Sequence, residues 1–337
     1  MTRPPITLSI AVVHSMLQAV TERTLLPESA VCGLLEQAGV VPELLRESGA
    51  RVTTDQYVAL MSSLIGELDD EGLGFYSRKL PRGSFTLVGR SSLGASSLGA
   101  ALRHAAHTHR LLQDDVNAFC TFEQNLTSLT LEFRNAETSG RNFLHELLLR
   151  IFWQLLAWLN DARLMPVRFD FSFRQPAYAS IYATAFPAPI RFEQPRSAVW
   201  FDSAALEAPV RRDEQAFRNM MHHAIDNLVL PRYDDSTTSA RVRALLQQRD
   251  SGWPDLETMA RQFHVAPSTL QRRLAVEGTS YQSLKDQLRR DLAIAQLNTT
   301  HKPLNILASE LGFADSAAFQ RAFKAWTGTV TGSYRKR

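Results

Sequence analysis

The chain has 337 residues, of which 45% are hydrophobic and 21% charged, the balance of an ordinary globular protein long enough for two domains. Its two cysteines, Cys32 and Cys120, are too few for a disulfide framework or a cysteine-based zinc site, so we expect buried, reduced thiols. The longest apolar stretch, Phe143 to Leu159, contains charged residues and reads as a buried helix, since a membrane-spanning helix needs about 20 apolar residues. No secretory signal follows Met1, and we therefore expect a cytoplasmic protein that does not associate with a membrane.

The charge is unevenly distributed along the chain. Residues 238–337 hold 15 Lys and Arg against 8 Asp and Glu, whereas the preceding residues hold 22 against 26. A basic end on a mildly acidic body predicts a polyanionic partner for that end alone.

The first two hundred residues predict a mixed α/β body. A capping box, Thr53-Thr-Asp-Gln56, opens one helix, and a Gly/Ser-rich run leads into a second over about 97–112. Strict alternation then predicts half-buried, antiparallel strands at 128–134, 167–174, 189–192 and 199–202, with the apolar helix of 141–161 between the first two. We assign residues 1–210 to this body.

A boundary region follows at residues 211–240. A helix is expected over about 212–228, and the polar stretch 231–239 lacks hydrophobic periodicity, which is typical of a linker. Residues 241–337 would form the last domain. The fold class expected is therefore α+β, with a mixed α/β domain followed by an all-α domain.

The all-α domain begins with a helix-turn-helix pattern. Pro254 and Leu256 start one helix, His264-Val-Ala266 forms the turn, and Pro267 starts the next helix, in which Leu270 and Leu274 point inward. The outward face then displays Ser268, Gln271 and Arg272, with Arg273 at its flank. Arg pairs with guanine and Gln with adenine in the major groove, so this face has the chemistry of a DNA reader.

A second helix-turn-helix follows the first at a fixed spacing. Gly312 marks the turn, Asp315 is a natural N-cap, and Phe319 and Phe323 face inward. The outward residues of this second reading helix are Ser316, Ala317, Gln320, Arg321 and Lys324. One amphipathic helix, about 280–298, joins the two units, and its length of about 28 Å suits readers placed one DNA turn apart.

These motifs closely resemble the AraC/XylS regulators. The resemblance rests on Ser268-Thr-Leu-Gln-Arg-Arg-Leu274, on the stretch Leu311 to Gly328, and on Tyr334-Arg335. It implies that Ser268, Gln271 and Arg272 face bases in the first reader, and Ser316, Ala317, Gln320 and Arg321 in the second. It also implies duplex promoter DNA and RNA polymerase as partners. Two departures are Ala266, which replaces the usual capping Ser, and Thr331, which replaces a Pro.

The body resembles the ligand-binding half of one AraC branch, the branch with an arabinose-binding-like domain. The matching stretches are Leu80 to Phe85, Ser97 to Arg103, Phe186 to Phe192, and Ala198 to Phe201. The resemblance implies an effector-sensing and dimerising domain, and hence a homodimeric regulator, which we expect to be an activator. It does not name the effector or the residues that bind it. The alternative is a ligand-independent regulator whose body serves only as a dimerisation or interaction scaffold.

No enzyme, metal site or cofactor is predicted. His104, His107 and His109 do not share one helix face, and His145-Glu146 lacks the second histidine of a zinc-protease motif. A nucleophile elbow, a P-loop and a dinucleotide fingerprint are all missing from the sequence. We expect the basic pair Arg289-Arg290 to be solvated.

Overall fold

The computed structural model describes residues 5–23, 25–161, 163–179, 182–221, 237–248 and 252–335. It forms two compact units that interleave along the sequence: Met1–Ile10, Leu35–Tyr57 and Arg232–Arg337 make up one, and Ala11–Leu34 and Val58–Pro231 the other. The units do not follow the expected division at residues 210 and 240, because two segments from the first sixty residues belong to the unit of the C-terminal helices. The expected division into domains therefore remains a prediction. The expected linker helix over about 212–228 is described only as far as Met221, with helix α9 at Glu214–Met221. Its remainder and all but the end of the polar linker lie outside the described residues.

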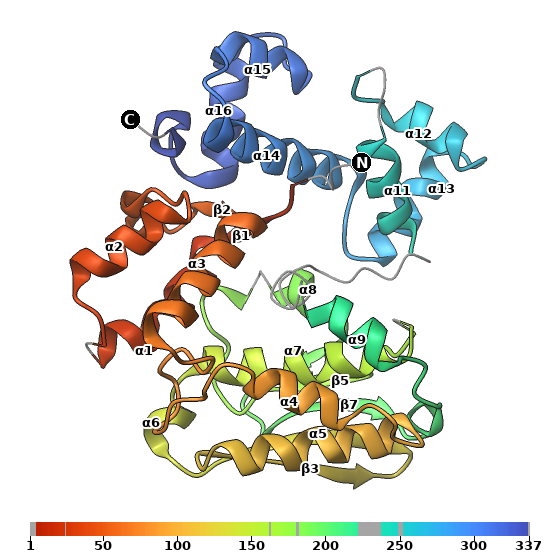
Figure 1. The fold of residues 1–337 in the computed structure, drawn as a ribbon. Helices are drawn as coiled ribbons and strands as arrows, with labels where there is room; N and C mark the ends of the chain where they lie inside the picture. The colour runs from red at the N-terminus through yellow and green to blue at the C-terminus, as the bar shows by residue number, and fades with distance from the viewer. Residues whose placement is uncertain are drawn as a thin grey trace. The chain divides into compact units, whose positions relative to one another are not determined.

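The second unit is the α/β body, built on a five-stranded sheet (Figure 1). Its strands are β3 (Val116–Glu123), β4 (Leu126–Phe133), β5 (Arg168–Asp170), β6 (Ile190–Arg191) and β7 (Ser197–Asp202), in the order β3-β4-β7-β5-β6. Neighbours are antiparallel except β5 and β6, which are parallel. The expected fold class is thus confirmed. The expectation of a strand over 167–174 was too long, and β3 was not predicted.

Helix α7 (Asn142–Leu159) lies against one face of the sheet, as its apolar composition predicts. Leu129, Val199 and Phe169 of that face are fully buried, and the Trp153 ring meets Phe169 edge to face at 5.9 Å. Helix α5 (Leu98–Leu112), capped by Ser97, packs on α7 through His109, whose ring lies 5.6 Å from Phe152. The predicted helices over 97–112 and 141–161 are therefore confirmed.

The remaining helices of the unit surround this core. They are α1 (Ile10–Glu22), α2 (Glu28–Gln37), α3 (Thr54–Leu68), α4 (Ser84–Ser91), α6 (Ala136–Ser139), α8 (Tyr182–Ala185), η3 (Ala204–Glu207) and α9 (Glu214–Met221). Helices α1, α2 and α3 each contain residues of both units. The capping box forms as expected: the Thr53 amide donates to Gln56 Oε1 at 2.9 Å, and the Gln56 amide donates to Thr53 Oγ1 at 3.2 Å.

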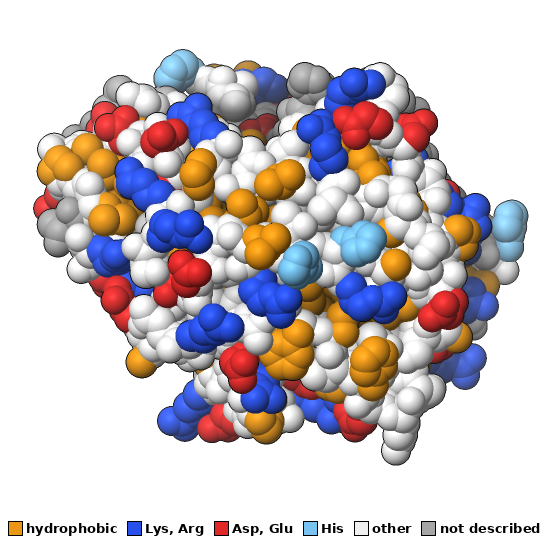
Figure 2. Space-filling model, turned by 60° about the horizontal axis from the view of Figure 1, so that its bottom comes forward, with side chains coloured by type: hydrophobic (Ala, Val, Ile, Leu, Met, Phe, Trp, Pro, Cys, Tyr) orange, Lys and Arg blue, Asp and Glu red, His pale blue; other side chains and the backbone are white. Residues whose placement is uncertain are grey.

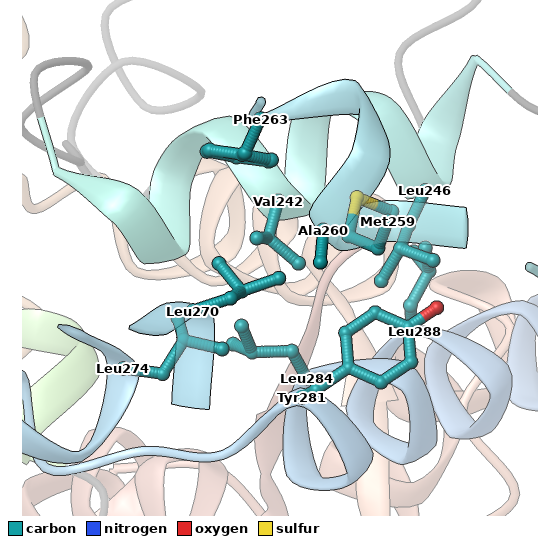
Figure 3. Packing of buried hydrophobic residues seen from close by; sticks show 10 residues of the cluster. All are labelled: Val242, Leu246, Met259, Ala260, Phe263, Leu270, Leu274, Tyr281, Leu284 and Leu288. Carbon is teal, nitrogen blue, oxygen red and sulfur yellow. The ribbon is translucent and has the colours of Figure 1, made fainter. Parts of the chain in front are cut away.

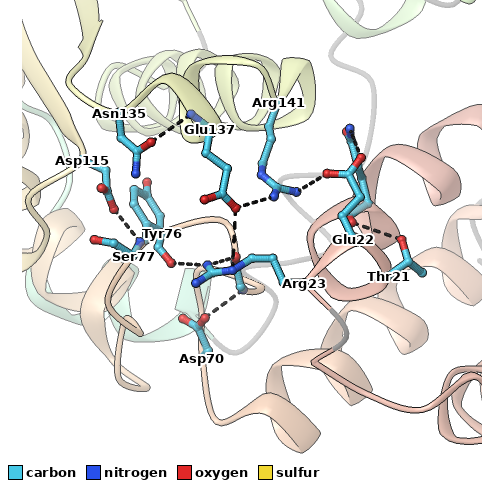
Figure 4. A network of polar contacts seen from close by, with 12 residues as sticks. Thr21, Glu22, Arg23, Asp70, Tyr76, Ser77, Asp115, Asn135, Glu137 and Arg141 are labelled. Carbon is cyan, nitrogen blue, oxygen red and sulfur yellow. Dashed lines mark hydrogen bonds and ion pairs between the residues drawn. The ribbon is translucent and has the colours of Figure 1, made fainter.

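A polar network joins the start of α7 to the loops before α4 (Figure 4). The Arg141 guanidinium forms ion pairs with Glu22 and Glu137, both at 2.9 Å. Nearby, the buried Asp70 carboxylate accepts hydrogen bonds from the amides of Gly72, Gly74 and Leu80, each at 2.8 Å. Because a carboxylate that accepts several amide hydrogen bonds fixes the loop around it, this network holds the turns in place without a regular element.

The first unit contains the C-terminal helices: α11 (Thr238–Gln247), α12 (Leu256–Gln262), α13 (Pro267–Val276), α14 (Tyr281–Thr299), α15 (Leu304–Glu310), α16 (Ser316–Thr327) and η4 (Thr331–Tyr334). It also contains a two-stranded antiparallel ribbon, β1 (Thr7–Ser9) with β2 (Arg51–Thr53), and the short η1 (Pro42–Arg46). Thr7 Oγ1 donates to Asp291 of α14, and the Arg51 amide donates to the Tyr334 hydroxyl. The N-terminal ribbon is therefore part of the same compact unit as the C-terminal helices.

Candidate nucleic-acid interface

The first helix-turn-helix consists of α12 and α13, packed on α11 and the first half of α14. Ten buried side chains form their shared core, with Met259, Leu270, Leu274 and Leu284 fully buried, as Figure 3 shows. His264 has a φ of 54°, the left-handed conformation that turns the chain sharply between the two helices. Helix α11, which supplies Val242 and Leu246 to this core, was not predicted from the sequence.

The outward face of α13 carries the residues expected to read DNA. Ser268, Gln271, Arg272 and Arg273 are all exposed, on the side opposite to Leu270 and Leu274. Among the described residues, none of these four side chains has a hydrogen bond or an ion pair within the chain. The helix starts at Pro267, and its N-cap Ala266 makes no side-chain capping bond, as the sequence predicts.

The second helix-turn-helix repeats this arrangement with α15 and α16. Gly312, with a φ of 74°, takes the turn position, and the Asp315 carboxylate caps α16 by accepting from the Ala318 amide at 2.7 Å. Phe319 and Phe323 are fully buried. The outward residues are Ala317, Gln320, Arg321 and Lys324, which are exposed, and Ser316, which is partly buried.

Helix α14 connects the two units as one continuous helix of 19 residues, capped by Ser280. Its buried face shifts along its length. Tyr281, Leu284 and Leu288 belong to the core of the first helix-turn-helix, whereas Ala293, Ile294 and Leu297 are buried further along. Leu292 and Ala295 are only partly buried, and Leu292 still packs against the core of the first helix-turn-helix.

The basic pair on α14 has a structural role, so its expected solvation is wrong. The Arg289 guanidinium lies 4.9 Å from the Trp253 ring and 5.0 Å from the Phe313 ring, which are cation–π distances. Arg290 pairs with Asp291 at 3.1 Å, and both side chains are largely buried. Sequence alone could not separate these arginines from Arg272, because only the fold shows which helix face meets another element.

Exposed basic residues lie on both reading helices. On the face turned forward in Figure 2, Lys and Arg side chains are interspersed with Asp and Glu. On α13, by contrast, the neighbours Arg272 and Arg273 are both exposed, and so are Arg321 and Lys324, which are three residues apart on α16. Unpaired guanidinium and ammonium groups on helices of this motif can bind phosphates and base edges.

The sites considered in the body are occupied by structural contacts. His109 is buried and bonded to the Tyr76 hydroxyl at 3.0 Å, while His104 and His107 are exposed. His145 is buried between the Ser197 hydroxyl, 2.7 Å away, and the Ser139 carbonyl. In the described part of the chain, no group of three metal-ligating side chains comes together, and no helix is long and apolar enough to span a membrane. Cys32 and Cys120 are free thiols, only partly buried instead of buried.

Comparisons with known proteins agree with this arrangement. Residues 7–210 match the family described as the arabinose-binding domain of AraC transcription regulators, and residues 259–337 match a helix-turn-helix domain family. The ornithine utilization regulator of Pseudomonas aeruginosa is 30% identical over 90% of this chain and 90% of its own length. The transcriptional regulator VqsM of the same organism is 34% identical over 28% of this chain and 29% of its own.

Among solved structures, the regulator CdpR from Pseudomonas aeruginosa aligns over 98% of this chain and 99% of its own, with 19% identity and a TM-score of 0.30, and adds nothing to the assignment. The relatives are named as transcriptional regulators and not as enzymes. The chain belongs to the AraC family of transcription regulators, with an arabinose-binding-type N-terminal domain and a helix-turn-helix DNA-binding domain.

Proposed function

We propose that this regulator binds promoter DNA through the outward faces of α13 and α16 and responds to a small-molecule effector through residues 1–210. DNA binding is supported by the pair of helix-turn-helix units. In each unit the second helix exposes a Gln followed directly by an Arg, which are Gln271-Arg272 in α13 and Gln320-Arg321 in α16. In this arrangement Ser268, Gln271 and Arg272 of α13 contact bases. Ser316, Ala317, Gln320 and Arg321 do so in α16, with Arg273 and Lys324 at the flanks.

Effector response, activation and dimerisation are further parts of the proposal. The match of residues 7–210 to an arabinose-binding domain family supports a small-molecule effector, and so does the name of the ornithine utilization regulator. By the same resemblance the regulator acts as a homodimer and activates transcription by contacting RNA polymerase. Residues 211–240 serve as the linker, and residues 241–337 as the reader.

The DNA part is tested by mapping genomic binding sites and then measuring affinity for one such site and for its single-base variants. Arg272→Ala should weaken specific binding by about 1–3 kcal/mol and relax the preference at one base pair. Arg273→Ala, on the same helix, should weaken all sequences alike and reduce the salt dependence, because a phosphate contact carries no base information. Wild-type affinity and specificity in Arg272→Ala would refute the proposed register of α13.

A further inference from the structure

Glu146, on the helix that faces the sheet of the body, accepts its hydrogen bonds from neutral donors in the part of the chain that the structure describes. Glu146 of α7 accepts hydrogen bonds from the hydroxyl of Tyr178, at 3.1 Å, and from the hydroxyl of Tyr182. Desolvation raises the pKa of Glu146 to about 7, even though the two hydroxyls and the charge of Arg150 act in the opposite direction. The residue nevertheless remains partly accessible.

Aromatic rings line the surroundings of this carboxylate. The Tyr182 ring lies 5.3 Å from Phe186, 5.6 Å from Phe171, 5.8 Å from Phe192 and 6.0 Å from Tyr178. Phe171, Tyr182 and Phe186 are buried, whereas Tyr178 and Phe192 are only partly buried. The cluster therefore runs from the core of the body to its surface, and Glu146 is one of its partly accessible residues.

A desolvated carboxylate among aromatic rings is less favourable for the stability of a core than an apolar side chain would be. A desolvated carboxylate is stabilised best by a positive charge with its own hydrogen bonds, and replacing such a group by an apolar side chain is often neutral or stabilising. Aromatic faces attract cations as well, so an ammonium group placed here would gain from both the carboxylate and the rings. Neutral or anionic groups would gain neither.

We propose that Glu146, Tyr178 and Tyr182 form the effector site, and that the site takes the ammonium group of a small primary alkylamine. The ammonium donates to the Glu146 carboxylate in the place of the Tyr178 hydroxyl, and the aliphatic chain lies on the partly buried rings of Tyr178 and Phe192. This inference rests on the proposed function in one respect, namely that the N-terminal domain responds to an effector.

Binding of a cation at this carboxylate is linked to its titration. The groups that face it are the hydroxyls of Tyr178 and Tyr182 and the charge of Arg150, while the neighbouring His145 is bonded to Ser197 on the other side. Since a bound ammonium favours the ionised carboxylate, binding lowers the pKa of Glu146. Near pH 7 the complex should therefore release part of a proton, and affinity should fall as the pH drops below 7.

The test is isothermal titration calorimetry of the full chain with 1-butylamine, and with 1-butanol and butyrate as neutral and anionic counterparts. We expect saturable binding of the amine only. Glu146→Gln, which keeps the size and hydrogen-bonding capacity of the side chain, should reduce amine affinity by about tenfold or more. Glu132→Gln is the matched control, since Glu132 is a more exposed carboxylate paired with Arg196, and it should bind as wild type does.

Two further measurements, of proton release and of DNA binding, decide between the possible outcomes. Titrations of the wild type in two buffers with different ionisation enthalpies report proton release even if Glu146→Gln does not fold. Absence of amine binding, equal binding by Glu146→Gln, or binding without proton release near pH 7 would each overturn the site. DNA binding of the same preparations separates the two ideas: a chain that binds DNA but no amine refutes the site alone. A chain that binds the amine but no DNA refutes the proposed function and leaves the site intact.

Discussion

The backbone amide of Arg51 donates a hydrogen bond to the Tyr334 hydroxyl at 2.9 Å, although the two residues are 283 positions apart in the sequence. Tyr334 is fully buried and lies in η4, directly after the second reading helix. The Arg51 side chain in turn donates to Thr7 Oγ1 and to the Thr7 carbonyl, each at 2.8 Å, so the two strands of the ribbon are held together where they meet the C-terminal helices. The end of the reader thus depends on residues from the beginning of the chain.

Gly49 should be intolerant of a side chain because of this docking. A Cβ at Gly49 would lie 2.6 Å from the Thr327 carbonyl oxygen, a backbone atom at the end of α16 that cannot easily move aside. We expect Gly49→Ala to destabilise the chain by about 1–3 kcal/mol, as overpacking usually does. The measurement is the free energy of unfolding by denaturant, with limited proteolysis to follow the N-terminal ribbon.

Gly33→Ala is the control for this prediction. Gly33 lies within α2, and a Cβ there would meet nothing within 4 Å, so alanine should be neutral or should stabilise the helix by up to about 1 kcal/mol. Equal stabilities for Gly49→Ala and the wild type would show that the ribbon does not pack on α16 in solution.

Ala266 marks a place where the first reading helix can be strengthened. Its φ of −66° and ψ of 149° are those of an N-cap, but its methyl group cannot accept a hydrogen bond from the α13 amides. Ala266→Ser should stabilise the chain by about 0.5–2 kcal/mol, which thermal denaturation would detect. Ala275→Ser, at an exposed position within the same helix, should be neutral or slightly destabilising. A loss of stability in Ala266→Ser would mean that the N-cap lies elsewhere.

The single helix α14 restricts the spacing of the DNA half-sites. Because the first core includes Leu284 and Leu288, and Ile294 and Leu297 are buried further along, the helix forms one continuous spacer between the readers. In a binding site found by genomic mapping, each reading helix contacts one half-site. Inserting about 5 base pairs between the two half-sites should reduce affinity to that of a single half-site, and so should inserting about 10 base pairs. Gel-shift titration measures this. Wild-type affinity with the insertion of a full turn would contradict a rigid spacer.

The sequence predicted the elements whose signals are local. The Thr53–Gln56 capping box, the Asp315 cap and the inward Leu270 and Phe319 all follow from spacing along one helix, and the structure has each of them in place. The same is true of most residues on the outward faces of α13 and α16. They lie opposite to the buried stripe of their helix and are exposed, with Ser316 partly buried.

What could not be predicted depends on contacts between distant segments. The interaction of Arg289 with Trp253 and Phe313 requires the loop before α12 and the turn before α16 to meet on one face of α14. The sequence around Arg289 contains no signal that predicts this meeting. In the same way, the packing of Gly49 against Thr327 has no signal in either stretch. The role of Glu146 emerges only when Tyr178 and Tyr182 fold back over α7.

The buried His109 should make stability depend on pH in a defined direction. Desolvation lowers the pKa of His109 from its ordinary value of 6.5 to about 4, so the folded state keeps the ring neutral where the unfolded chain takes up a proton. The contribution of neutral His109 is complete above pH 6.5 and is lost as the pH falls toward 4. Between pH 7.5 and pH 5 this costs about 2 kcal/mol of unfolding free energy.

Other groups titrate in the same range, so the prediction is made for a difference between variants. His145, with its pKa lowered to about 4, acts in the same direction, while Glu146, with its pKa raised to about 7, acts in the opposite one. His109→Gln removes one titrating group but retains a hydrogen-bond partner for Tyr76. Its destabilisation relative to the wild type, measured by denaturant unfolding, should therefore shrink by about 2 kcal/mol from pH 7.5 to pH 5. His104→Gln, on the exposed side of the same helix, is the control for the substitution itself. A constant difference between His109→Gln and the wild type would mean that the His109 imidazole becomes protonated within the folded core.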